Sequence, residues 1–187
     1  MKPKSRKFKI LFIAGALMLF FNFANSLAVM VQDEAPGIYK DKNNFFTFSP
    51  PAGWLKEEIS GDTVSQVNFT SPDGKAGLAI IAALDEGDLN DLFSLKNVYI
   101  KDYQRRFPKG KFSLAWDILA ERKAIKINFE LPRVIKQEQY FFYDQGVRFD
   151  LVYGVVNAAD FKKYNQLALD AFVTVERQKP AKHKQNK

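Results

Sequence analysis

The chain has 187 residues, with 28 lysines and arginines against 21 acidic residues, one histidine and no cysteine. Five of the basic residues lie in residues 1–28 and five lie after Glu176, so residues 29–176 carry 18 basic against 21 acidic side chains. A nucleic-acid-binding domain carries its positive charge on the folded body, so that class is excluded. The lack of cysteine excludes thiol chemistry and a lipoprotein anchor, which needs a cysteine at its cleavage site.

The first 28 residues have the three-part pattern of a secretory signal: a basic start, an apolar run at 10–23 and small residues at 24–28. The apolar run is shorter than the roughly 20 residues that span a bilayer, which favours a cleaved signal over a membrane anchor. We therefore expect export to the periplasm or an equivalent lumen, and a mature protein that is soluble or peripherally attached.

The next segments predict a linker at 29–37 and then a domain at 38–176 that begins with short strands. Alternation and turn residues indicate strands near 44–49, 54–59 and 65–71. Residues 77–84 are apolar without a break, which predicts a strand buried on both faces, so both sides of the sheet should be covered.

A first helix is predicted at 89–107, because apolar residues recur at helical spacing and Pro108 and Gly110 follow. A meander should come next, with strands near 112–118, 125–131, 135–143 and 147–155. Its turns are expected at 121–123 and as a three-residue loop at 144–146. A second helix should start at Asp160 as N-cap, with these residues facing the core: Phe161, Tyr164, Ala168, Ala171 and Phe172.

These elements predict a single-domain α+β fold, an antiparallel sheet covered by helices on both faces. The remaining residues, 177–187, form a basic tail that we expect to be disordered. The tail is either a solvated C-terminus or a contact for anionic lipid headgroups.

Two stretches resemble the PsbP-like family, which includes the PsbP subunit of photosystem II, bacterial DcrB-type proteins and a Ran-binding import factor. Residues 39–54 (YKDKNNFFTFSPPAGW) are similar to the family's opening "nGFsfsyPxgW" pattern. Residues 148–154 (RFDLVYG), followed by a helix that leads into residues 171–173 (AFV), are similar to its closing half. The resemblance implies an α/β/α sandwich, and a binding or assembly role without a catalytic centre. No histidine-based family contact can be carried over, since residues 38–176 contain no histidine.

Little in the residues themselves points to catalysis. His183, the one histidine, lies in the tail, and no glycine-rich phosphate loop occurs. A carboxylate pair drawn from Glu130, Asp144 and Asp150 is the remaining enzymatic alternative. We expect that the protein is not an enzyme and has no cofactor, with calcium as a possible exception.

Two charged clusters are candidate sites. Four carboxylates before the first helix are either a calcium site or helix-capping charges: Asp85, Glu86, Asp88 and Asp91. Four cations at its end are either a docking patch for an acidic partner or charges that complement the helix dipole: Arg105, Arg106, Lys109 and Lys111. Trp54 and Trp116 are either surface anchors for a partner or core residues, and we expect them in the core.

The prediction is therefore an exported, non-catalytic PsbP-like protein that docks on a membrane or envelope protein complex. The alternative is a periplasmic protein that binds a small ligand or calcium.

Overall fold

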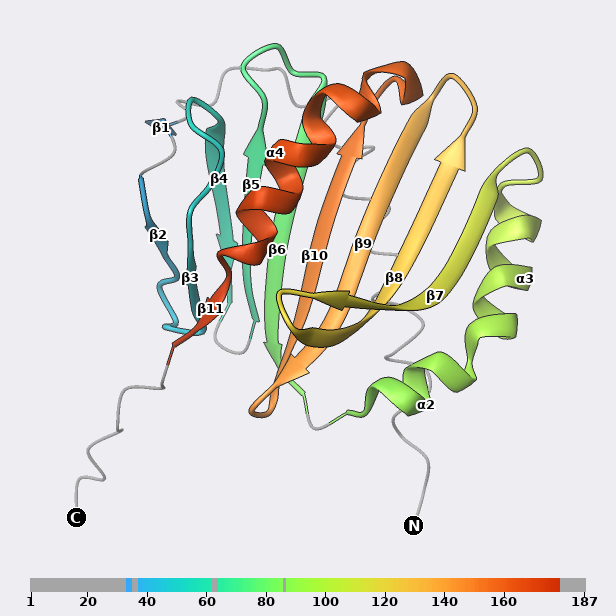
Figure 1. Cartoon of the computed structure of the whole chain (residues 1–187), viewed down its shortest axis with the longest axis horizontal. Helices are drawn as coiled ribbons and strands as arrows, with labels where there is room; N and C mark the ends of the chain where they lie inside the picture. Colours follow the sequence, from blue (N-terminus) through green and yellow to red (C-terminus); the bar gives the residue numbers. More distant parts are fainter. Residues whose placement is uncertain (1–32, 35–36, 62–63, 86, 179–187) are drawn as a thin grey trace. The chain divides into compact units, whose positions relative to one another are not determined.

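Eight strands form the main sheet of the computed structural model, which describes residues 33–34, 37–61, 64–85 and 87–178 (Figure 1). Their spatial order is β1 (Asp33–Glu34), β4 (Leu55–Ser60), β5 (Val64–Thr70), β6 (Ala76–Leu84), β10 (Val147–Val155), β9 (Ile135–Asp144), β8 (Arg122–Leu131) and β7 (Lys111–Leu119). All neighbouring pairs are antiparallel. All described residues belong to one compact unit, so the predicted single-domain α+β class is confirmed.

The centre of the sheet is buried on both faces, as the unbroken apolar run predicts. In β6 every residue from Ala76 to Ala83 is buried, while Leu84 at its end is exposed. The partner strand β10 is buried along nearly all its length. A strand buried on both sides reads as a continuous hydrophobic run rather than as an alternation, and this explains why β6 was recognisable from the sequence.

Two hairpins have tighter turns than the sequence predicted. Ala120 and Glu121 alone connect β7 to β8, and both have positive φ, 47° and 64°. Gln145 and Gly146 alone connect β9 to β10, with φ of 48° and 78°. The predicted turn at 121–123 and the predicted three-residue loop at 144–146 are therefore wrong. A two-residue loop with both φ values positive matches the right-handed twist of the flanking strands.

Helix α4 (Phe161–Val173) covers one face of the sheet (Figure 1). All five residues predicted to face the core from this helix are buried. The Tyr153 hydroxyl donates to the Phe161 carbonyl at 2.9 Å and so ties β10 to the start of α4. Asp160 occupies the N-cap position of α4 as predicted, but its side chain makes no cap hydrogen bond. Instead, Asn157 caps the preceding 3-10 turn (Ala158–Asp160) by accepting from Ala159 N at 3.1 Å.

The predicted first helix is two helices, α2 (Leu89–Ser94) and α3 (Lys96–Arg106), separated at Leu95. Tyr103 on α3 stacks on Phe112 with ring centroids 4.3 Å apart and also contacts Phe129. By strand alternation Phe129 faces away from the α4 side. The α2–α3 pair thus packs at the β7–β8 end of the sheet. Helical cover over the rest of that face stays a prediction.

Strand pairing also involves residues outside the expected domain boundaries. β1 lies inside the expected linker and pairs with β4. β11 (Glu176–Arg177) joins β3 (Phe46–Phe48) and β2 (Tyr39–Lys40) in a second, three-stranded antiparallel sheet. Arg177, the first residue of the expected tail, donates to the Phe45 carbonyl at 3.1 Å. The signal segment and residues 179–187 lie outside the described residues.

Candidate functional site

The acidic cluster before α2 divides into carboxylates with different roles. Asp88 is the N-cap of α2, and its carboxylate accepts from Asn90 N at 2.6 Å. Asp91 lies in the first turn of this helix, where negative charge is favourable. Glu86 lies outside the described residues. Within the described ranges no three acidic or histidine side chains come together as metal ligands. The capping role of Asp88 is thus visible, while the calcium site stays a prediction.

Asp85 belongs to a network with the strands rather than to the helix start. Its carboxylate accepts from Arg148 Nη1 at 2.8 Å and from the Tyr143 hydroxyl at 3.3 Å. The backbone N–H of Gly87 donates to the same carboxylate at 2.9 Å. A Cβ at position 87 would lie 2.3 Å from the Tyr143 hydroxyl. A side chain at position 87 would therefore have to displace the Tyr143 ring from its place beside Asp85.

Arg148 also faces a second carboxylate, that of Asp150, with Nε 3.6 Å from Oδ1. Asp150 is 1% exposed. Burial raises the pKa of Asp150 to about 7, and the nearby Asp85 adds to this rise, while Arg148 opposes it. Burial also lowers the pKa of Arg148, but the charges of Asp150 and Asp85 outweigh it and leave the pKa raised. Arg148 therefore stays cationic between two carboxyls, one of which titrates near neutral pH.

More buried polar groups share this face of the sheet. Gln137 and Gln139 occupy alternate positions of β9 and are 2% and 1% exposed. Gln137 Oε1, Gln139 Nε2 and the Tyr99 hydroxyl of α3 have no hydrogen-bond partner among the described residues. Burial raises the pKa of Tyr99, against the opposing charge of Arg148. Buried polar groups are costly when unpaired, so hydrophobic packing does not explain these residues. We call them the polar cluster: Asp85, Arg148, Asp150, Gln137, Gln139 and Tyr99.

The sequence did not predict that these polar residues come together, although it carries a signal for it. Gln137, Gln139 and Asp150 are polar residues at buried positions of strands that are otherwise mostly apolar. A buried polar residue is the informative exception in a folded chain.

The three carboxylates considered for acid–base chemistry have different cationic partners. Glu130 lies 4.0 Å from Lys136, and Asp144 lies 3.8 Å from Arg122. Asp150 faces Arg148. No contact joins any two of these carboxylates among the described residues, so the geometry provides no support for the carboxylate pair.

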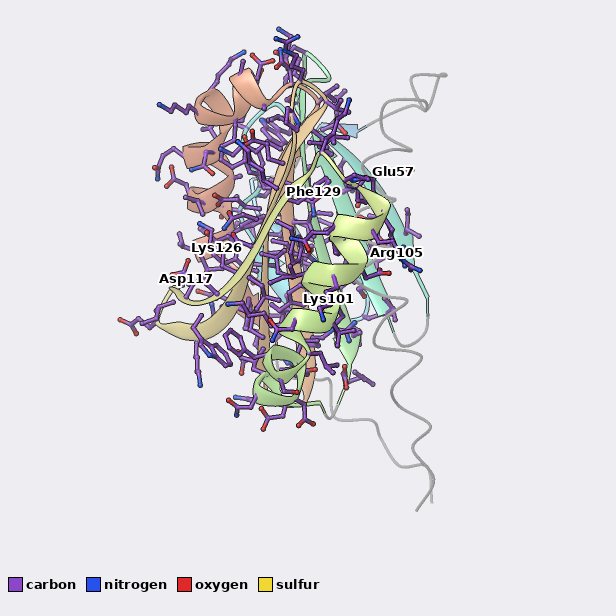
Figure 2. The ribbon with its side chains drawn as sticks, turned by 90° about the vertical axis from the view of Figure 1, so that its right-hand side faces the viewer. Glu57, Lys101, Arg105, Asp117, Lys126 and Phe129 are labelled. Atoms are coloured by element: carbon purple, nitrogen blue, oxygen red, sulfur yellow. The ribbon has the colours of Figure 1, made fainter. Side chains whose placement is uncertain are left out.

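Of the four predicted cations, Arg105 and Arg106 end α3, Lys109 lies in the turn that follows, and Lys111 begins β7. Arg105 and Arg106 both form ion pairs with Asp102, at 2.7 and 2.8 Å. Lys109 and Lys111 are exposed. Figure 2 shows Lys101 and Arg105 on the outer side of α3. We call this region the basic surface: Lys101, Arg105, Arg106, Lys109 and Lys111.

The β7 end of the sheet also displays aromatic surface. Trp116 is 36% exposed and stacks on Phe93 of α2 with ring centroids 4.5 Å apart. Lys123 Nζ lies 4.1 Å from the centroid of the Trp116 ring. The core prediction for Trp116 is therefore wrong, whereas Trp54 is buried as expected. An alternating strand at a sheet edge need not bury its apolar residues.

None of the helices in the described part of the chain is both long and apolar enough to span a membrane.

No protein-family model matches the sequence, and no curated protein matches it either.

Solved structures do match the fold. The solution structure of cyanobacterial PsbP (CyanoP) from Synechocystis sp. PCC 6803 has a TM-score of 0.55 at 13% sequence identity. That match covers 81% of this chain and 98% of the other. A crystal structure from Bacteroides thetaiotaomicron has a TM-score of 0.50 at 13% identity and covers 76% of this chain, which spans about half (48%) of that protein. The predicted resemblance is confirmed at the level of the fold: the chain has a PsbP-like fold.

Proposed function

We propose that the chain is an exported, non-catalytic binding or assembly protein that docks on a membrane or envelope protein complex through the basic surface. The observation that carries this proposal is the contrast between this surface and the rest of the domain. Five cations lie between positions 101 and 111 with Asp102 as the one acidic side chain among them. Residues 29–176 as a whole carry more acidic than basic residues.

Helix-dipole complementarity explains only part of this charge. The dipole acts within the last turn of a helix, where Arg105 and Arg106 lie. Lys109 and Lys111 follow the end of α3 and gain little from it. The Arg105 side chain is 77% exposed even though it is paired with Asp102. Exposed clusters of one sign raise the rate of encounter with partners of the opposite sign, so the partner should present an acidic surface.

The experiment is chemical cross-linking in gently solubilised envelopes, followed by purification of the tagged chain. The test variant is Arg105→Ser with Lys109→Ser. The control is Lys75→Ser with Lys162→Ser, which removes the same charge from exposed lysines elsewhere. We expect a membrane-protein partner that is recovered with the wild type and the control but lost with the test variant. Its capture should weaken as salt rises.

Two results would contradict the proposal. Equal recovery of the partner with test and control variants would show that the basic surface is not the docking site. Recovery of the chain without any protein partner, but with binding to anionic lipid vesicles, would replace protein docking by lipid binding.

A further inference from the structure

The middle of the outer edge of β7 has no charged residue, proline or bulge, whereas Lys111 and Asp117 flank it. β7 is the last strand of the main sheet and pairs with β8 without interruption from Lys111–Glu130 to Leu119–Arg122. Monomeric proteins usually place a proline, a bulge or a charge in the middle of such a strand. The middle of β7, residues 113–116, has the sequence Ser-Leu-Ala-Trp and an unbroken register, and Ser113, Ala115 and Trp116 are exposed.

The turn geometry shows which backbone groups of β7 face the open side. In a two-residue hairpin the flanking residues, here Leu119 and Arg122, form a hydrogen-bonded pair. By alternation Ser113, Ala115 and Asp117 bond to β8, whereas the even-numbered residues between 112 and 118 direct N–H and C=O outward. Ile118 supports this assignment, because its N–H is donated to Asp117 Oδ1 at 2.8 Å instead of to β8.

We propose that two copies of this chain pair their β7 strands antiparallel about a two-fold axis at Leu114. In this register Phe112 lies opposite Trp116 of the copy and Leu114 lies opposite its equivalent, so outward backbone groups meet outward groups. The same register places Lys111 opposite Asp117 of the copy, twice by symmetry. Registers centred one residue to either side place Lys111 opposite Ala115 or Leu119 instead.

The proposed contact is self-limiting. A two-fold pairing uses the β7 edge of both copies and leaves no second β7 edge to extend the assembly. It joins two eight-stranded sheets and brings Phe112 of one copy opposite Trp116 of the other. Within each copy Phe112 stacks on Tyr103 and Trp116 stacks on Phe93. Figure 2 looks onto this edge and shows α3 on one side of β7, with Asp117 at the bend of the strand. This inference goes beyond the proposed docking and does not depend on it.

The experiment is sedimentation velocity of the purified chain over a wide range of concentrations. The variants are Lys111→Asp, Asp117→Lys and the double exchange. Each single change creates two like-charge oppositions in the proposed register, so we expect dimerisation about tenfold weaker than in the wild type. The double exchange restores opposite charges at both positions and should restore the dimer. Melting curves for every variant separate lost pairing from lost folding.

A second comparison tests the backbone contact itself. Trp116→Ala and Trp116→Pro remove the same aromatic ring, but only proline removes the outward N–H, which an edge strand tolerates. The proline variant should dimerise more weakly than the alanine variant. A wild type that stays monomeric at every concentration would overturn the proposal. This is the result expected if the bend of β7 keeps the edges of two copies apart. A dimer that is indifferent to both single charge reversals would also overturn it.

Discussion

Replacing Asp150 with asparagine should change how the stability of the domain depends on pH. Asparagine keeps the size of the side chain and one acceptor oxygen but cannot ionise. Arg148 stays paired after the change, because the Asp85 carboxylate is 2.8 Å from its Nη1. The substitution thus removes one titration from the polar cluster without leaving a buried cation alone, which would be strongly destabilising.

The sign and size of the effect follow from burial. Burial raises the pKa of Asp150 to about 7 in the folded chain, against about 3.9 in an unfolded one. The folded state therefore binds the proton more tightly, and this stabilisation is lost as pH rises through about 7. Each pKa unit corresponds to about 1.4 kcal/mol, and about two of the three units lie above pH 5. Wild-type stability should thus fall by about 2–3 kcal/mol from pH 5 to pH 8 relative to Asp150→Asn.

Urea unfolding followed by tryptophan fluorescence at pH 5, 6, 7 and 8 measures this difference. The stability of wild type relative to Asp150→Asn should fall steadily from pH 5 to pH 7 and level off toward pH 8. Asp170→Asn, which removes an exposed carboxyl of α4, serves as the control for the pH dependence of the rest of the chain. Parallel curves for wild type and Asp150→Asn would refute the reasoning and show that Arg148 keeps Asp150 ionised throughout.

Three further predictions concern the turn, the helix contact and calcium. Asn-Gly in place of Ala120-Glu121 should raise the free energy of unfolding by about 1–2 kcal/mol, because both residues have positive φ; unchanged urea curves would contradict this. The Tyr164 hydroxyl donates to Asp73 and holds the pKa of that carboxyl well below its ordinary value. Tyr164→Phe should therefore lower the free energy of unfolding by about 1 kcal/mol at neutral pH, and by less in acid, where Asp73 becomes protonated. Urea unfolding that shows the same loss at neutral and at acid pH would refute the coupling. Millimolar calcium should leave the melting temperature unchanged, because Asp85 is already paired with Arg148. A rise that Asp88→Asn abolishes would instead support the calcium site.

Periodicity was sufficient where one physical requirement determined the pattern. The buried stripe of α4 and the continuous apolar run of β6 both follow from burial alone, and both predictions are confirmed. The break at Leu95 could not be predicted in this way, because the apolar spacing continues across it. The break separates Phe93, which stacks on Trp116, from Tyr103, which stacks on Phe112. The two helices thus differ in their contacts with β7, which the local spacing of apolar residues does not show.

The site was harder to predict, because its members are distant in sequence. Asp85 and Arg148 are 63 residues apart in the chain and meet because β6 and β10 are neighbours in the sheet. The sequence showed Asp85 only beside Glu86 and Asp88, and this proximity suggested a metal site. Pairing between strands gave Asp85 a cationic partner instead. The basic surface, by contrast, is contiguous in sequence and could be identified from the chain alone.

The position of the two proposed surfaces makes them testable apart from folding. Substitutions at exposed positions usually change stability by less than about 0.5 kcal/mol, and Arg105, Lys109 and Lys111 are all exposed. The core that supports the fold lies between α4 and the sheet, where Phe149 and Phe172 are almost fully buried. A variant of the β7 edge or of the basic surface that loses binding while its melting temperature is unchanged has therefore lost a surface and not the fold. Because Lys111 belongs to both surfaces, Arg105 and Lys109 test docking alone, whereas Asp117 tests self-pairing alone.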